Sequence, residues 1–164
     1  MADRLLVVAS SLDLTAPYSS TPAWWQLLKA LAERGVDVVV TPYHGPAIAS
    51  PWWTPASNPC QREGDIVRLL KRLAPSAAAR ATVGGGPLTR RLVERITRPR
   101  WQRHLARLLT RYADRQAVLF LTVPPNHFDG IPAFIARRFG IPTYFYDADV
   151  PASLPSFGGF RSGF

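Results

Sequence analysis

The chain has 164 residues, of which 47% are hydrophobic, and its formal net charge at pH 7 is +9. This length and apolar content predict a globular protein with one sizeable core and exclude a disordered, low-complexity chain. The single cysteine, Cys60, excludes an internal disulfide. No apolar run approaches the roughly 20 residues that cross a bilayer, and no secretory leader is recognisable, so we expect a cytoplasmic protein.

The N-terminal segment predicts a strand, a helix and a second strand. Residues 5–9 form a continuous apolar run, which is typical of a strand covered on both faces in a parallel sheet. After a polar loop, Thr21 is a suitable N-cap and Pro22 suits the first helical position. Gly35 can take the left-handed conformation that ends a helix, and residues 36–40 form a second apolar run.

Residues 41–60 are predicted to form a long loop, because prolines recur through them at a density that regular elements do not tolerate. Loops of this length in compact domains usually have a function, and the adjacent Trp52 and Trp53 argue against disorder. The two tryptophans either anchor the loop to the domain by packing or form a lid over a substrate ring or a second domain.

Three amphipathic helices are predicted after the loop, over residues 63–73, 87–97 and 99–112. A connector of small residues at 74–86 contains three consecutive glycines at 84–86. We interpret these glycines as a hinge, although backbone N–H groups there could also contact a phosphate. The connector lacks the spacing of a dinucleotide fingerprint or of a P-loop, so neither kind of nucleotide site is predicted.

The remaining residues predict a strand over 117–123, a helix over 128–139, a strand over 141–146 and an open tail over 150–164 that is rich in proline, glycine and serine. We therefore predict an α/β fold, with a Rossmann-like, open, mostly parallel sheet of four or more strands and helices on both faces. Residues 1–164 are expected to form a single domain.

Polar side chains follow the predicted strands at the point where each strand ends. In a parallel sheet these ends meet at one edge, which is where α/β proteins bind ligands. Tyr43 follows the second predicted strand and is expected to lie at this edge as well. The candidate substrate-binding residues there are Ser10, Ser11, Tyr18, His44, Asn126, Asp147 and Asp149. Ser and Asp after a strand also commonly form turns or caps, and this alternative stays open for Ser10, Ser11 and Asp149.

His127 and Asp13 are the candidate catalytic residues. His127 follows two prolines that stiffen the backbone. An imidazole with a pKa near neutrality could accept a proton from a hydroxyl nucleophile or donate a hydrogen bond to a sugar or phosphate. Capping the next helix is the alternative role for His127, and Asp13 could act as a general base. Asp147 and Asp149 would point to opposite sides of a continuing strand and no third ligand is evident, so no metal site is predicted.

The Arg-rich helices within residues 87–115 carry nine arginines against Glu94 and Asp114. Three interpretations are open: a solvated face with a coding bias towards arginine, attraction to anionic lipid headgroups or a lipid-linked acceptor, and nucleic-acid binding. Nucleic acid is the least favoured, because no recognised module accompanies the charge. The expected peripheral contact with an anionic membrane would use Arg90, Arg91, Arg95, Arg98, Arg100, Arg103, Arg107 and Arg111.

Three segments carry a resemblance to a known family. Residues 4–40 comprise the strand, polar loop, Trp-Trp helix, glycine and second strand, and residues 119–126 and 144–155 follow, the last reading YFYDADVPASLP. Through these segments the chain resembles the N-terminal domain of GT-B glycosyltransferases, in which two Rossmann-like domains face each other across a cleft. The resemblance implies that this domain contacts the acceptor through loops after its strands, while a second domain binds the nucleotide-sugar donor. No cofactor is then expected on this domain itself.

Two departures from the family pattern modify this expectation. The first loop lacks the pair of glycines that several members place near the donor phosphates, and the paired carboxylate motif for the donor is absent. We therefore expect the chain to be one half of the enzyme and to lack transferase activity alone. The leading hypothesis is the acceptor-binding half of a glycosyltransferase. The alternatives are a standalone flavodoxin-like binding or regulatory domain without catalysis, and a basic nucleic-acid-binding protein.

Overall fold

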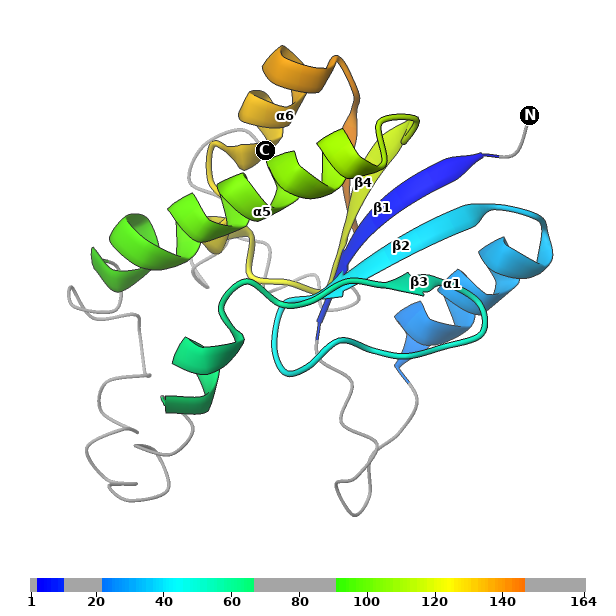
Figure 1. Ribbon diagram of the computed structural model, residues 1–164, viewed down its shortest axis with the longest axis horizontal. Helices are drawn as coiled ribbons and strands as arrows, with labels where there is room; N and C mark the ends of the chain where they lie inside the picture. Colours follow the sequence, from blue (N-terminus) through cyan, green and yellow to red (C-terminus); the bar gives the residue numbers. More distant parts are fainter. Residues whose placement is uncertain (1–2, 11–21, 67–90, 147–164) are drawn as a thin grey trace.

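The structure is a computed structural model that describes residues 3–10, 22–66 and 91–146. These residues contain a 5-stranded sheet in the order β3-β2-β1-β4-β5, in which every neighbouring pair is parallel (Figure 1). The predicted α/β, Rossmann-like fold is confirmed. Among the described strands, the third in chain order, β3, lies beside β2, as in the Rossmann strand order, whereas in flavodoxin-type sheets the third strand lies beside β1.

The first three elements follow the sequence prediction closely. They are β1 (Arg4–Ala9), α1 (Ala23–Glu33) and β2 (Asp37–Pro42). Pro22 occupies the N-cap position of α1 in an extended conformation, one residue before the predicted helical position. Gly35 has a φ of +84°, which a glycine adopts without the steric cost that other residues incur, and α1 ends there as expected.

The proline-rich loop contains a strand that the sequence did not predict. In β3 (Thr54–Pro55) the chain pairs in parallel with β2, and the backbone N–H of Ala56 donates to the carbonyl of Val40 at 2.8 Å. Proline is tolerated because β3 is an edge strand of the described sheet and Ala56 supplies the donor. The prediction of a loop over residues 41–60 was therefore wrong at β3 and at its first two residues, which end β2.

The Arg-rich segment forms one continuous helical run where two helices were predicted. A π-helical turn, η1 (Val93–Thr97), leads directly into α5 (Arg98–Arg111). The backbone N–H of Arg98 donates to the carbonyl of Val93, five residues earlier. Pro99 has no N–H, and its ring crowds the preceding turn of an ordinary helix. The wider π-turn relieves this crowding, so the helix continues through the proline.

The last elements are β4 (Ala117–Leu121), a 3-10 turn η2 (Pro125–His127), α6 (Ile131–Phe139) and β5 (Thr143–Tyr146). Both strands are shorter than predicted, and α6 starts three residues later than predicted because residues 128–130 form a turn that ends at Gly130, whose φ is +76°. Pro132 lies in the first turn of α6, so it begins this helix and does not kink it.

Other predicted segments are described in part or not at all. Residues 61–66 are helical, and the rest of the predicted helix over 63–73 lies outside the described residues. The connector at 74–86 and the tail at 150–164 also lie outside them. Among the helices that are described, none is long and apolar enough to span a membrane.

Helices cover both faces of the sheet and create two cores. On one face, α1 packs through Trp24 and Leu28 onto the strands. On the other face, α5 and α6 pack through Trp101 and Ile135 against Phe120 and its neighbours. These side chains are almost completely buried. Each such burial contributes roughly 1.5–3 kcal/mol to the free energy of folding, so the two cores hold the strand ends in fixed positions.

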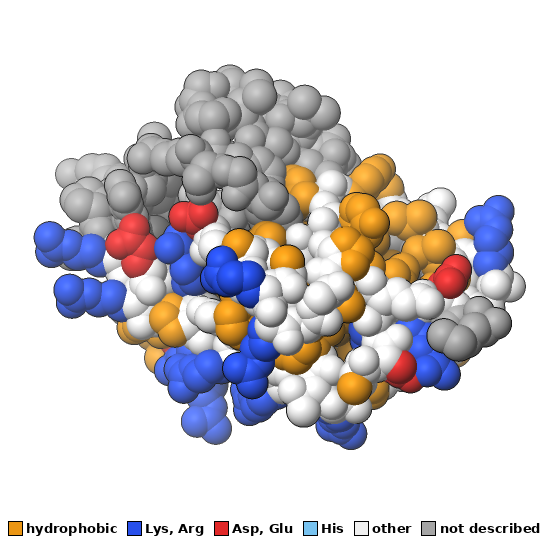
Figure 2. Space-filling view, turned by 90° about the horizontal axis from the view of Figure 1, so that it is seen from above, with side chains coloured by type: hydrophobic (Ala, Val, Ile, Leu, Met, Phe, Trp, Pro, Cys, Tyr) orange, Lys and Arg blue, Asp and Glu red, His pale blue; other side chains and the backbone are white. Residues whose placement is uncertain are grey.

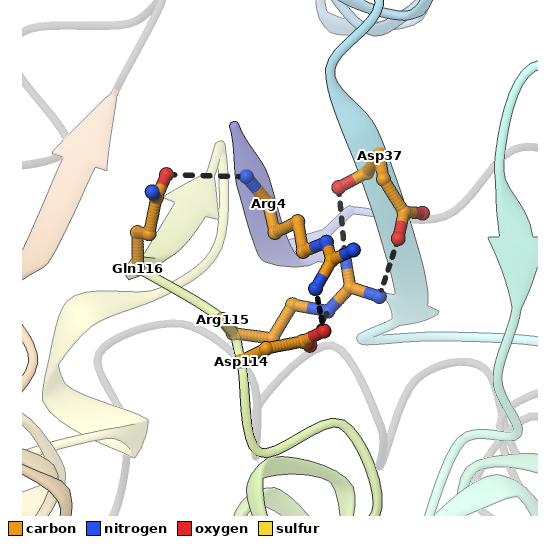
Figure 3. Close-up of polar contacts among 5 residues, drawn as sticks. All are labelled: Arg4, Asp37, Asp114, Arg115 and Gln116. Carbon is orange, nitrogen blue, oxygen red and sulfur yellow. Dashed lines mark hydrogen bonds and ion pairs between the residues drawn. The ribbon is translucent and has the colours of Figure 1, made fainter. Parts of the chain in front are cut away.

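A polar network joins the strands at the amino edge of the sheet (Figure 3). Arg115, whose side chain is 5% exposed, donates to the backbone carbonyl of Asp37 at 2.7 Å and to its carboxylate at 2.8 Å. Arg4 pairs with Asp114, and the backbone N–H of Arg4 donates to the side chain of Gln116 at 3.2 Å. The network therefore connects the starts of β1, β2 and β4.

We predict that Arg115→Met lowers the free energy of unfolding by about 2 kcal/mol, because it removes two charge-assisted hydrogen bonds from a buried position. Urea denaturation followed by circular dichroism measures this change. The matched control is Arg111→Met, at an exposed position in the last turn of α5, where we expect a change within about 0.5 kcal/mol. Equal effects of the two substitutions would contradict a specific role for Arg115.

A second buried polar contact involves His104 of α5. The hydroxyl of Thr41 donates to the carbonyl of Ser57 at 2.9 Å, and Thr41 Oγ1 lies 3.0 Å from Nε2 of His104. Since the only hydroxyl proton of Thr41 is used by Ser57, Nε2 of His104 must be the donor to Oγ1. Burial, with the nearby Arg107, lowers the pKa of His104 to about 4, so this imidazole is neutral at pH 7.

We predict that the free energy of unfolding falls as the pH drops from 6.5 towards 4. Over this interval the unfolded chain binds a proton at His104 that the folded protein excludes, which favours unfolding by on the order of 3 kcal/mol. Denaturation measured across this pH range tests the prediction. His104→Gln should reduce the slope and leave the part contributed by His127, whose pKa burial also lowers to about 4, whereas Arg34→Gln, at an exposed position, should leave the slope unchanged.

Candidate functional site

After the neighbouring strands β1 and β4, the chain continues to helices on opposite faces of the sheet. From β1 the chain leads to α1 on one face of the sheet, and from β4 it leads to α6 on the other face (Figure 1). Ligands of open α/β sheets bind at such switch points. Thr122, just after β4, has a φ of +51°, which is unusual for a β-branched residue. Nothing in the sequence pointed to Thr122.

Tyr43 and His127 form the centre of the site. Tyr43 follows β2 and His127 ends η2, and the phenol oxygen of Tyr43 is hydrogen-bonded to Nδ1 of His127. The ring of Tyr43 packs 6.0 Å from that of Trp101 and 5.6 Å from that of Phe128, measured between centroids. Those contacts hold the phenol beside the imidazole of His127, at 5.7 Å between ring centroids, and this imidazole is only half-buried. His127 therefore presents Nε2 as its remaining polar atom.

Burial determines the protonation state of this pair. It lowers the pKa of His127 to about 4, with smaller contributions from His44 and Arg98. The pKa of Tyr43 is raised, mainly by burial and secondarily by Cys60. Both groups are therefore uncharged at pH 7. The sequence prediction of an imidazole with a pKa near neutrality was wrong, because it could not include this burial.

Arg98 holds a positive charge next to the pair. Its Nη2 donates to the backbone carbonyl of Asn126 at 3.2 Å and lies 3.7 Å from a carboxylate oxygen of Asp129. The ring of His44 lies 4.2 Å from that of Tyr43, edge to face, and His44 is exposed. The site thus combines a neutral imidazole, a guanidinium group and an exposed second imidazole.

Two sequence-predicted roles change. Oγ of Ser10 accepts a hydrogen bond from Nε1 of Trp24 at 2.8 Å, so this side chain links the end of β1 to α1 and acts neither as a turn former nor as a cap through that bond. The N-cap of α6 is Gly130, with no side-chain cap hydrogen bond, so His127 does not cap that helix. Asn126 is exposed and contributes a backbone carbonyl to Arg98.

The other candidate residues all lie outside the described residues. They are Ser11, Asp13, Tyr18, Asp147 and Asp149. Their proposed contacts stay predictions. Among the residues that are described, no group of three or more His, Cys, Asp and Glu side chains could hold a metal ion.

The tryptophans of the proline-rich loop act as a packing anchor. Trp53 is buried against Trp24 of α1, at 6.5 Å between ring centroids, and its Nε1 donates to the carbonyl of Ile48 at 2.8 Å. Trp52 packs edge to face on Trp25 at 4.8 Å. This confirms the anchoring interpretation of the loop and favours it over a lid.

The sequence missed the partners that determine the chemistry of His127. Tyr43 is separated from it by 84 residues and was expected at the same edge, but nothing in the sequence indicated that its hydroxyl is hydrogen-bonded to His127. In the sequence, Arg98 is recognisable only as one of the nine arginines of the Arg-rich helices. Contacts between residues far apart in the chain produce no recognisable pattern in the sequence, so the hydrogen bond to Tyr43 and the proximity of Arg98 could not be predicted from residue spacing.

We predict that the NMR signals of His127 titrate near pH 4, and that Arg98→Met moves this titration upward, because it removes a nearby positive charge. The matched control is Arg95→Met, at an exposed position one turn earlier in the same helical run, which should leave the titration in place. A His127 signal that titrates near pH 6.5 in the unmodified protein would contradict the buried, neutral pair.

Comparisons with models of protein families, with curated proteins and with solved structures found no match to this chain.

Proposed function

We propose that this chain is the acceptor-binding domain of a glycosyltransferase that transfers a sugar from a nucleotide-sugar donor to a hydroxyl group. Support comes from the all-parallel sheet of the Rossmann type and from polar side chains at its switch point. A second domain would bind the donor, and this domain would hold the acceptor. No cofactor is assigned to the domain itself.

The observation that carries the proposal is the neutral Tyr43–His127 pair beside Arg98. A hydroxyl acceptor needs hydrogen-bonding groups that fix its oxygen without an ion pair, and Nε2 of a half-buried imidazole meets this need. With a pKa of about 4, His127 is a weak base, so its role is to orient the acceptor hydroxyl. Asp13 is the proposed general base.

The partner molecules follow from the same proposal. The acceptor would be a sugar or a lipid-linked acceptor, and the arginines of η1 and α5 would attract the anionic surface of a membrane that carries it. Most of the rate of the complete enzyme would come from positioning donor and acceptor and from electrostatic stabilisation of the departing phosphate.

We predict that His127→Ala lowers kcat/KM for the acceptor about tenfold in the natural polypeptide that contains this chain, because one oriented hydrogen bond is lost. Tyr43→Phe should have a smaller effect, since it removes only the hydroxyl that holds Nδ1. Transfer is measured by mass spectrometry with a panel of nucleotide sugars and hydroxyl acceptors.

The same assay separates the function from the residue assignment. Arg34→Gln, at an exposed position after α1, is the control and should leave kcat/KM unchanged. Unchanged transfer in His127→Ala would remove His127 from the acceptor site while leaving the reaction in place. Failure of the natural polypeptide to transfer any sugar of the panel would count against the glycosyltransferase itself.

A further inference from the structure

A groove of about 830 Å³ lies between α5 and α6. Its walls include four arginines, namely Arg100, Arg103 and Arg107 of α5 and Arg138 of α6. The volume is within the range of sites that hold small organic molecules. Neither member of the Tyr43–His127 pair lines this groove, so what it binds is a question separate from the proposed reaction.

The positive charge in the groove is largely uncompensated by the residues that the structure describes. Arg100 pairs with Glu63, and Nε of Arg103 donates to the carbonyl of Pro99 at 3.2 Å within α5. In the described ranges, no ion pair with an acidic side chain is found for Arg103, Arg107 or Arg138. Figure 2 shows Lys and Arg side chains along much of one face, with few acidic ones among them.

The same groove also offers an apolar surface. Phe134 of α6 and Pro99 and Ala106 of α5 lie among the arginines, and Phe134 packs on Phe139 at 6.4 Å between ring centroids. A ligand that fits these walls carries a compact anion next to an apolar group. A simple inorganic ion would use the guanidinium groups and leave the apolar surface in water.

We infer that this groove binds an organic phosphate, with the phosphate held by Arg103, Arg107 and Arg138 and the apolar portion resting on Phe134. Guanidinium groups match phosphate oxygens in geometry and form charge-assisted hydrogen bonds with them. The phosphate belongs either to a phospholipid headgroup or to a soluble phosphate ester. The soluble-ester source does not depend on the glycosyltransferase proposal, whereas the headgroup source deepens the membrane attraction proposed there for the arginines of α5.

The test measures binding to the full 164-residue chain with two probes. Hexyl phosphate, in isothermal titration calorimetry, represents a soluble phosphate ester, with inorganic phosphate as its reference. Vesicles of phosphatidylglycerol and phosphatidylcholine, in co-sedimentation, represent the headgroup, with pure phosphatidylcholine vesicles as their reference. Hexyl phosphate should bind more tightly than inorganic phosphate, because only its alkyl chain can use the apolar surface.

Two triple variants of equal charge distinguish the groove from the overall charge. The groove variant carries Arg103→Gln, Arg107→Gln and Arg138→Gln. The control variant carries Arg34→Gln, Arg62→Gln and Arg137→Gln, all at exposed positions that neither line the groove nor belong to η1 or α5. The groove variant should weaken binding at least about tenfold, and the control variant less than about twofold.

Each outcome decides the inference. Loss of hexyl phosphate binding in the groove variant alone supports a soluble ligand, and loss of vesicle binding in that variant alone supports a lipid headgroup. Equal weakening by both variants would overturn the inference in favour of diffuse attraction by the net charge. Absence of saturable binding to either probe would also overturn it. Circular dichroism of both variants checks that they remain folded.

Discussion

The parallel pairing of β1 with both β2 and β4 determines the position of every other element. Val7 lies opposite Val40 on one side and opposite Leu119 on the other, and Leu6, Val7 and Val8 are fully buried. Because all three strands run in the same direction, the segments that follow them emerge at one edge. Since β1 and β4 are followed by helices on opposite faces, this edge is also the switch point of the sheet. The site exists at that edge because of this pairing.

Packing around the pair determines what the site can do. Tyr43 lies against Trp101 and Phe128, which belong to the core between the sheet and the two helices α5 and α6. The same packing that stabilises the fold partly desolvates the half-buried imidazole of His127, which lowers its pKa to about 4 and keeps it neutral at pH 7. A neutral imidazole suits hydrogen bonding to an uncharged acceptor. The chemistry of the edge is thus a consequence of the core beneath it.

The described arginines make different kinds of contact, which the net charge of the chain does not reveal. Arg115 is buried and connects strands at the amino edge, while Arg98 contacts the segment around His127 at the opposite end of α5. Arg103 and Arg107 face the groove beside α6. A net charge of +9 says nothing about this division. Position in or after α5 determines whether Arg115, Arg98 and the pair Arg103 and Arg107 contact the fold, the site or the groove.

The sequence alone was sufficient for the α/β class, for β1, α1 and β2, and for the edge where ligands are expected, because apolar runs and a glycine at the helix end are local signals. It did not predict β3, the π-turn before Pro99 or the low pKa of His127. Each of these depends on contacts between segments distant in the chain or on how one helical turn accommodates a proline. Only the tertiary structure brings Tyr43 to His127, because burial and cross-sheet hydrogen bonds are properties of the packed molecule.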